Sequence, residues 1–141
     1  MSNSNTSLKL NETEKLFFIK ALSRLAYVDS KASNEEKEFI KQLYNSFNLQ
    51  NYSLDEITAS TDEQIIAEAK QITNRQTAME LIKEMCMLAN SDGDLSERET
   101  LFIGQMGIAM NLELEKIEQI SRWVIDRIIW LEEGKIIFEK I

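Results

Sequence analysis

Two short acidic segments of this chain contain side chains that could bind an ion if the fold brings the two segments close together. Carboxylate oxygens are hard ligands, and a cluster of them favours calcium, magnesium or manganese. A typical zinc site is not expected, because the chain has no histidine and only one cysteine. Carboxylates occur in both segments: Asp29 and Glu36 in the first, and Asp92, Asp94 and Glu99 in the second.

The same residues have a purely structural interpretation. Glu36 and Glu99 each stand three residues after a serine that can cap a helix, which is the capping-box arrangement. Asp92 precedes Gly93, a pair that is typical of a tight turn. An EF-hand is excluded, because the twelfth residue counted from Asp92 is Ile103 rather than glutamate. Both interpretations, a cation site and a pair of helix caps, stay open.

The residue types that catalysis needs are largely missing. Histidine is absent, and there is no glycine-rich phosphate loop, nucleophile motif or metal triad. The single cysteine, Cys86, cannot form a disulfide within the chain, and its neighbours Met85, Met87 and Leu88 predict a small buried side chain. The sequence therefore predicts a protein that is not an enzyme.

The charge balance limits the classes of partner. Acidic residues number 24 against 16 basic ones, which gives a formal net charge of −8. Such a surface argues against nucleic acids and anionic membrane surfaces, and favours proteins or cations. The first residues lack the pattern of a secretory signal, and the longest uncharged stretch, 100–112, is too short to cross a bilayer. We expect a soluble cytoplasmic protein without direct membrane insertion.

Helix starts recur along the chain, and no segment shows the alternation that is typical of strands. Five segments have the pattern of a helix cap followed three residues later by glutamate or glutamine; they begin at Asn11, Ser33, Ser53, Thr61 and Ser96. Apolar residues at helical spacing follow, and proline is absent. These features predict an all-α chain of seven helices. We expect a flexible lead at 1–10, a helical domain at 11–134 and an apolar tail at 135–141.

The two halves of the chain repeat one another. Residues 19–50 align with 82–113 without a gap, at an offset of 63 residues, and 12 of the 32 positions are identical. Each copy is predicted to be a helix, a short loop and a capped helix. Because neither copy can bury its apolar stripe alone, we expect two helical hairpins that pack against each other around a pseudo-two-fold axis.

Two later segments have unusual apolar patterns. Residues 101–112 are apolar around most of a helix that contains Gly104 and Gly107, which predicts a central core helix, with a ligand groove as the alternative. The next helix is predicted from about 114 to 133 and ends at Gly134. We expect the apolar tail to fold back on the bundle, with a dimer contact as the alternative. The apolar residues of the tail are Ile136, Ile137, Phe138 and Ile141.

The two acidic loops share a sequence pattern. Each follows a Leu-Ala pair and leads into Ser-x-x-Glu, and the second loop also has an Asp-Gly pair and a following apolar residue, whereas the first has Ser30 and Lys31 in the corresponding region. This pattern resembles that of the tellurite-resistance TerB-like family, over roughly residues 10–130. The resemblance implies a bundle of seven to eight helices and a non-enzymatic role in resistance to tellurite and other stresses. It also implies an acidic, metal-binding face, on which the matching positions are Asp29, Glu36, Asp92, Asp94 and Glu99.

Two functions of different classes are therefore expected. The first is a stress-response accessory protein whose acidic surface binds a divalent cation and protein partners, in a membrane-associated complex. The second is a metal-independent helical module that binds other proteins through an exposed apolar surface. Stabilisation of the fold by calcium, magnesium or manganese would distinguish the first function from the second.

Overall fold

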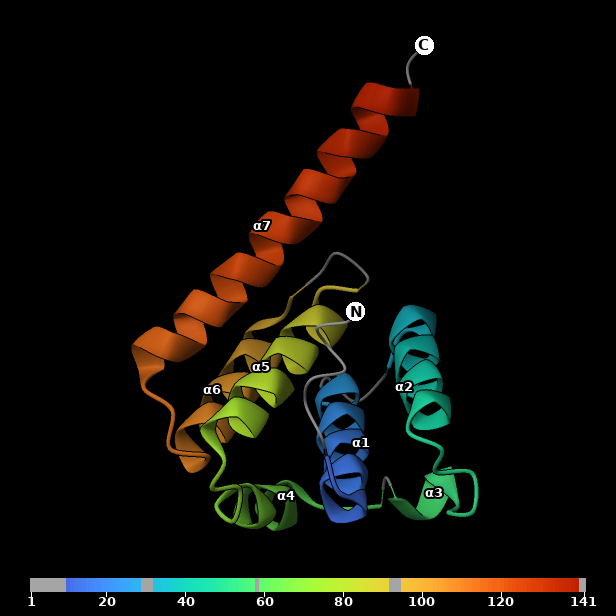
Figure 1. Ribbon diagram of the computed structural model, residues 1–141, viewed down its shortest axis with the longest axis vertical. Coiled ribbons are helices and arrows are strands. Elements are labelled where there is room, and N and C mark those ends of the chain that lie inside the picture. The colour runs from blue at the N-terminus through green and yellow to red at the C-terminus, as the bar shows by residue number, and fades with distance from the viewer. Residues whose placement is uncertain (1–9, 29–31, 58, 92–94, 140–141) are drawn as a thin grey trace.

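The all-α class predicted from the sequence is confirmed. The computed structural model describes residues 10–28, 32–57, 59–91 and 95–139, and within these ranges it has seven helices and no strand (Figure 1). In chain order the helices are α1 (Glu12–Ala26), α2 (Asn34–Ser46), α3 (Leu54–Ile57), α4 (Asp62–Ala69), α5 (Arg75–Ala89), α6 (Glu97–Ala109) and α7 (Leu114–Glu139).

Side-chain caps start several of these helices where the sequence predicts them. At the start of α2 the Ser33 hydroxyl accepts a hydrogen bond from the Glu36 amide at 3.1 Å, and the Glu36 carboxylate accepts one from the Ser33 amide at 2.9 Å. Ser96 and Glu99 repeat this arrangement in α6, at 3.1 and 2.9 Å. Each box gives partners to backbone amides that the first helical turn leaves unpaired. The boxes at Asn11 and Thr61 are formed as well.

The ends of α2 and α6 show the internal repeat in the backbone. Asn48 and Asn111 have φ angles of 58° and 72°, in the left-handed region that asparagine tolerates better than most residues. The amide of the next residue, Leu49 or Leu112, then donates to a carbonyl five residues earlier, at 3.3 and 2.9 Å respectively. Both helices therefore end in the same kind of cap, at equivalent positions of the two repeats.

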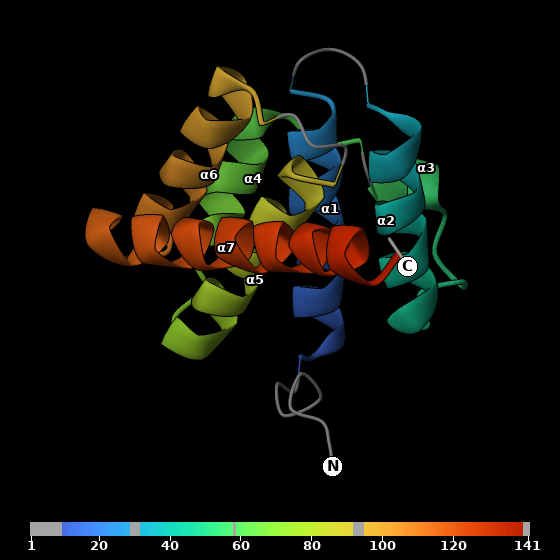
Figure 2. The ribbon, with the colours of Figure 1, turned by 90° about the horizontal axis from the view of Figure 1, so that it is seen from above.

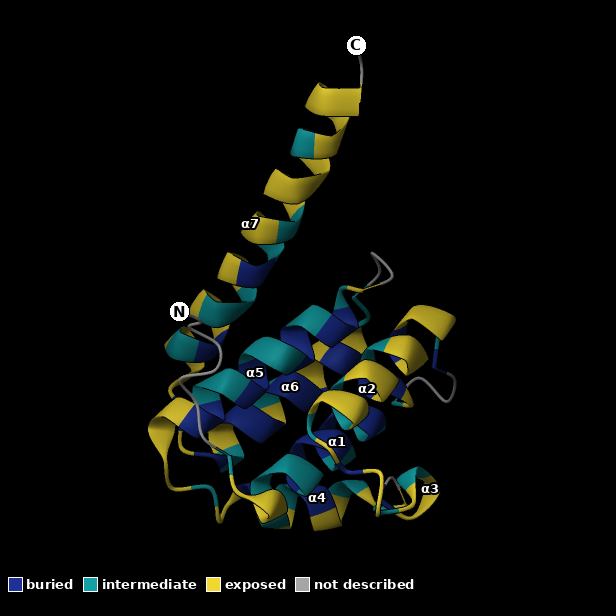
Figure 3. Ribbon diagram, turned by 45° about the vertical axis from the view of Figure 1, so that its right-hand side comes forward, coloured by how far each residue is buried: buried dark blue, intermediate teal, exposed yellow. Residues whose placement is uncertain are grey.

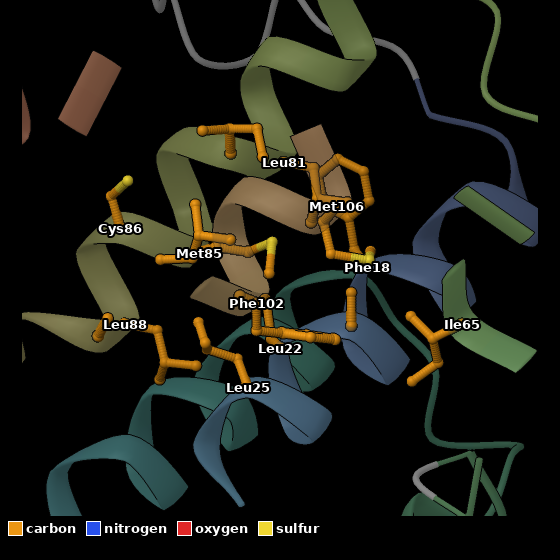
Figure 4. Packing of buried hydrophobic residues seen from close by; sticks show 14 of the residues in the cluster. Phe18, Leu22, Leu25, Ile65, Leu81, Met85, Cys86, Leu88, Phe102 and Met106 are labelled. Carbon is orange, nitrogen blue, oxygen red and sulfur yellow. The ribbon is translucent and has the colours of Figure 1, made fainter. Parts of the chain in front are cut away.

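Helices α1 and α5 form the centre of the bundle, and the two hairpins share one core. α1 packs against α5, while α2 packs against α1 and α6 against α5. Side chains from these central helices meet between them, together with others from α4 and α6 (Figure 4). Among the fully buried ones are Phe18 and Leu22 from α1, and Leu81 and Met85 from α5. The predicted packing of hairpins 12–48 and 77–111 in one core is confirmed.

Helix α4 packs against both α1 and α6. Its Ile65 is almost fully buried, and two ion pairs join the helix to α1. Lys20 contacts Glu68 at 3.4 Å, and Arg24 contacts Asp62. Because both pairs are partly exposed, each contributes at most about 1 kcal/mol, and apolar burial is the main attachment of α4.

The expectation of a central helix at 101–112 is wrong in part. α6 buries Phe102, Ile103 and Met106, but Leu101 is 63% exposed and Ile108 is 59% exposed. The reason is that α1 and α5 already fill the centre, so that α6 packs on them from the side. One face of α6 therefore carries apolar residues into solvent.

The two glycines of α6 have opposite environments, which gives a paired prediction. A Cβ added at Gly107 would lie 2.7 Å from Cγ1 of Ile117, whereas a Cβ added at Gly104 would have nothing within 4 Å. Gly104→Ala should therefore raise the free energy of unfolding by up to ~1 kcal/mol, because alanine favours the helix. Gly107→Ala should lower it by about 1–3 kcal/mol through overpacking against α7. Urea unfolding measures both changes, and a gain in stability for Gly107→Ala would contradict the observed contact.

The largest departure from the sequence expectation is in α7. The helix does not end at Gly134 but continues to Glu139, so the described part of the tail, 135–139, does not fold back on the bundle; Ile141 lies outside the described residues. In the described part of the tail, Ile136, Ile137 and Phe138 are 63–77% exposed. Figure 1 shows the C-terminal half of α7 leaving the other helices, and Figure 2 shows from above that α7 crosses α5. A glycine inside a helix costs only about 1 kcal/mol relative to alanine, which does not stop a long helix.

Helix α7 has 26 residues, which makes it the longest described helix. None of the described helices combines the length and the apolar character that crossing a bilayer requires.

Candidate interaction surface

Of the five predicted cation ligands, only Glu36 and Glu99 lie in the described part of the chain. Each is 4% exposed, and one carboxylate oxygen of each accepts the capping hydrogen bond described above. Asp29, Asp92 and Asp94 lie outside the described residues. Among the residues with a described position, no group of three or more potential ligands could hold a metal ion. The capping role of both glutamates is therefore observed, and the cation site stays a prediction.

The second loop offers a direct test of the cation site. Carboxylates about 4 Å apart repel each other by on the order of 1 kcal/mol in water, and a divalent ion would relieve that repulsion. If the site exists, millimolar calcium, magnesium or manganese should raise the melting temperature. Replacing Asp92 and Asp94 by asparagine should abolish that rise and leave the helicity unchanged. No rise in the parent protein, or an equal rise in the double variant, would leave Glu36 and Glu99 as caps only.

The single cysteine is a core residue, as its apolar neighbours predict. Cys86 is 1% exposed. Burial raises the pKa of its thiol to about 11, although a hydrogen bond with Ser121 acts in the opposite direction. The thiol is therefore protonated at neutral pH, which makes it a poor nucleophile and a poor metal ligand.

Helix α7 is attached to the bundle by its N-terminal half. Ile117 and Val124 are buried where the helix packs against α5 and α6. Directly before the first turn, Glu113 pairs with Arg75 of α5 at 2.6 Å, and the hydrogen bond from Arg75 lowers the pKa of that carboxyl. These contacts set the direction in which α7 leaves the bundle.

The C-terminal half of α7 is mostly exposed (Figure 3), and large apolar side chains are among its exposed residues. Six large apolar side chains between positions 129 and 138 are 46–77% exposed. Monomeric proteins seldom present so many large apolar side chains next to one another, and larger patches of this kind usually mark interaction sites. We call this set the distal face, although it spreads over more than half of the helix circumference; it consists of Ile129, Trp130, Leu131, Ile136, Ile137 and Phe138.

Two grooves flank the line where α7 crosses α5. The first has a volume of about 350 Å³, lies between α5, α6 and α7, and has Cys86 and Gly104 in its mainly apolar lining. A groove beside the helix at 101–112 is the alternative interpretation of that segment, and this groove includes residues of α6 in its lining. The second has a volume of about 320 Å³ and is lined by residues of α5 and α7, among them Met79, Ile120 and Trp123. We call this second one the α5–α7 groove.

Charged side chains line the α5–α7 groove. Lys83 and Lys116 are in its lining together with Glu80. Lys83 contacts Glu80, and Lys116 donates a hydrogen bond to Gln119 at 2.9 Å. Lys83 also contacts Glu84 at 3.6 Å, so two carboxylates balance the charge of this lysine at the groove.

One stripe of α7 connects the α5–α7 groove with the distal face. Ile120, Trp123, Trp130 and Ile137 follow one another at spacings of three or seven residues, so they lie along the same side of the helix. Trp123 is 53% exposed and lies in the lining of the groove. The seven-residue spacing is a signal that the sequence contains. The sequence predicts a helix that ends at Gly134. Ile137 would then lie outside the helix, so the sequence does not predict that it shares a stripe with the two tryptophans.

No family model, curated protein or solved structure matches the chain. The resemblance to the TerB-like family therefore stays a prediction that rests on the loop sequences.

Proposed function

We propose that this protein is a non-enzymatic, metal-independent helical module that binds another protein through the distal face of α7. The observation that carries the proposal is the exposure of this face, on a helix whose other half is anchored in the bundle. Removing such side chains from water contributes about 25 cal/mol per Å² of apolar surface, from which the free-energy cost of association is subtracted. The residue types also fit, because tryptophan and other large aromatic side chains carry much of the binding energy at protein interfaces.

The charge of the chain favours a protein partner over a lipid surface or a nucleic acid. The formal net charge is −8, and Glu132, Glu133 and Glu139 stand among the apolar residues of the distal half of α7. These carboxylates would be repelled by anionic lipids and by phosphate backbones. We accordingly expect a protein partner, in the cytoplasm.

Resistance to tellurite and other stresses is the biological setting that we propose for this module. Support comes from the resemblance of the two acidic loops to the TerB-like family. The seven-helix bundle agrees with the fold which that resemblance implies. In this setting the protein would act as an accessory subunit that joins a membrane-associated complex through α7, without a bound cation at the contact.

Site-specific photo-cross-linking in cells tests the proposed function. p-Benzoylphenylalanine is placed at Trp130 in the distal face and, as a matched control, at Leu101 on the exposed side of α6. The two side chains are 70% and 63% exposed, so they meet solvent to a similar extent. With the full chain expressed, we expect discrete protein adducts from position 130 and none from position 101.

Two outcomes of this cross-linking would overturn the proposal. Equal adducts from positions 130 and 101 would indicate random collisions with exposed apolar side chains. No protein adduct from position 130 would mean that no protein covers the distal face.

A further inference from the structure

The groove between α5, α6 and α7 is large enough for a small organic molecule. Its volume of about 350 Å³ falls within the range of about 300–1,000 Å³ that is typical of small-molecule sites. A water molecule in the liquid takes up about 30 Å³, so the groove has room for about a dozen non-hydrogen atoms. We call this space the α6 groove. It is separate from the distal face, because none of the six residues of that face lines it.

A glycine opens the wall that α6 gives to this groove. Gly104 lies in the lining, and a Cβ added to it would meet nothing within 4 Å. A glycine inside a helix costs about 1 kcal/mol relative to alanine. At Gly107 the close approach of Ile117 explains that cost, but Gly104 has no such contact. A ligand that fills the space beside Gly104 would explain it, since binding sites often lower the stability of a fold.

The polar side chains in the lining already have hydrogen-bond partners within the chain. The Asn90 amide donates to the Cys86 carbonyl at 2.7 Å, and the Thr100 hydroxyl donates to the Ser96 carbonyl at 3.0 Å. The Ser121 hydroxyl forms a hydrogen bond with the Cys86 thiol. A ligand therefore does not have to satisfy these donors, and it meets mainly apolar side chains. Those side chains are Leu95, Ile103, Leu114, Ile117 and Ile125.

The charges at the groove favour an uncharged ligand. Its lining contains one carboxylate and one guanidinium, those of Glu118 and Arg122, which stand four residues apart on α7 and are both exposed. Opposite charges at this spacing attract each other and leave no net charge at the rim. A charged ligand would gain little there and would lose part of its hydration against the apolar wall. The net charge of −8 also disfavours anions.

We propose that the α6 groove binds an uncharged, mainly apolar small molecule of about a dozen non-hydrogen atoms, such as a bicyclic aromatic compound. The apolar body of this molecule lies against Ile103 and Ile117 and occupies the space beside Gly104. Because the lining comes from three helices, a bound molecule also holds the N-terminal half of α7 to the bundle. The site does not depend on the proposed function, which uses the distal face.

Amide NMR spectra of the full chain, titrated with 2-naphthol, test the site. This probe is uncharged at neutral pH and has the size that the groove admits. We expect saturable shifts of the amides near Asn90, Gly104 and Ser121, with a Kd on the order of 0.1–1 mM. Shifts confined to the distal face, or no saturable shift up to the solubility limit of 2-naphthol, would overturn the proposal.

Two glycines provide a matched pair of variants. Gly104→Leu adds four carbon atoms, which fill about a third of the groove, and should weaken the binding of 2-naphthol at least ~10-fold. Gly134→Leu makes the same change outside the groove, where an added Cβ also meets nothing within 4 Å, and should leave the Kd within about twofold of the parent value.

Gly104→Ala is a milder variant that keeps the test decisive if leucine at this position prevents folding. Alanine is expected to stabilise α6, and its methyl group takes up part of the same space, so the binding of 2-naphthol should weaken about 3-fold. An unchanged Kd in the Gly104 variants would show that 2-naphthol binds elsewhere and would overturn the proposal.

Two charged analogues test the class of ligand. 2-Naphthoate and 2-naphthylmethylammonium carry the same ring system with a negative and a positive group. Both should bind at least ~3-fold more weakly than 2-naphthol, because the charge loses part of its hydration. Tighter binding of the anion that Arg122→Gln abolishes, or of the cation that Glu118→Gln abolishes, would show that the rim selects a charged ligand. Either result would overturn the uncharged class.

Discussion

Replacing Leu22 by alanine is expected to lower the free energy of unfolding by about 2–5 kcal/mol. The Leu22 side chain is fully buried in α1, which packs against α5 in the centre of the bundle. Its removal loses the free energy of transfer from water, and it leaves a cavity that the closely packed neighbours fill only in part. Urea unfolding followed by circular dichroism measures the change.

Met85 provides a second probe of the same core. It occupies the position in the second repeat that Leu22 occupies in the first, and it is equally buried. Met85→Ala should also cost about 2–5 kcal/mol, and each variant should unfold in a single transition because the hairpins share one core. The exposed Leu101→Ala is the control, with an expected change below ~0.5 kcal/mol. Two transitions, each sensitive to one substitution, would show that the hairpins fold independently.

Ile117→Asp is expected to lower the free energy of unfolding by more than ~3 kcal/mol, whereas Ile137→Asp should change it by less than ~0.5 kcal/mol. The two isoleucines lie on the same helix but differ in burial, since Ile117 is 5% exposed and Ile137 is 66% exposed. An aspartate at position 117 would place a carboxylate beside Gly107, at a largely buried position where no cationic partner is described. Thermal and urea unfolding of both variants measure the difference.

The comparison of positions 117 and 137 is made on the purified chain at a concentration where it is monomeric, because a protein bound to the distal face would add to the apparent stability. A chain that ends after Ile128 lacks the whole distal face and serves as the control. It should melt at the same temperature as the full-length monomer. Equal losses at positions 117 and 137, or a clear loss on truncation, would show that the distal half of α7 packs on its own bundle.

Local hydrogen bonds explain why the helix starts could be predicted from the sequence. A serine followed three residues later by glutamate satisfies backbone amides within one turn, so Ser33 and Ser96 mark the starts of α2 and α6 without reference to the rest of the chain. The repeat predicted the shared core for a similar reason. Two copies of one amphipathic hairpin bury their apolar stripes most simply against each other.

Features that depend on contacts between distant segments could not be predicted in this way. The apolar pattern of α6 does not reveal that α1 and α5 occupy the centre and leave Leu101 and Ile108 in solvent. Gly134 is compatible with a helix end, but it is also compatible with a helix interior at a cost of about 1 kcal/mol. The residues on both sides of Gly134 continue the helix, so the local preference for an end is overcome.

For the candidate interaction surface, the sequence predicts which apolar residues make a contact, but it does not predict what they contact. An apolar stripe in a sequence indicates that something covers it, but the hydrophobic effect has no direction and does not distinguish the same chain from another. Trp130 and Ile137 therefore predict a contact without identifying the partner. The acidic loops differ, because the capping role of Glu36 and Glu99 is local, whereas a cation site requires several carboxylates to be held at particular distances from one another.

Hydrogen exchange along α7 tests most directly whether its distal half is held away from its own bundle for a partner. At a concentration where the chain is monomeric, the amides of 130–139 should exchange at least ~100-fold faster than those of 117–124, because only the latter belong to the half that is packed against the bundle. When a protein that cross-links to position 130 is added, the distal amides should gain protection, while those of α1 and α5 stay unchanged. Equal protection of both halves of α7 at every concentration would contradict the assignment of the distal face as an interaction surface.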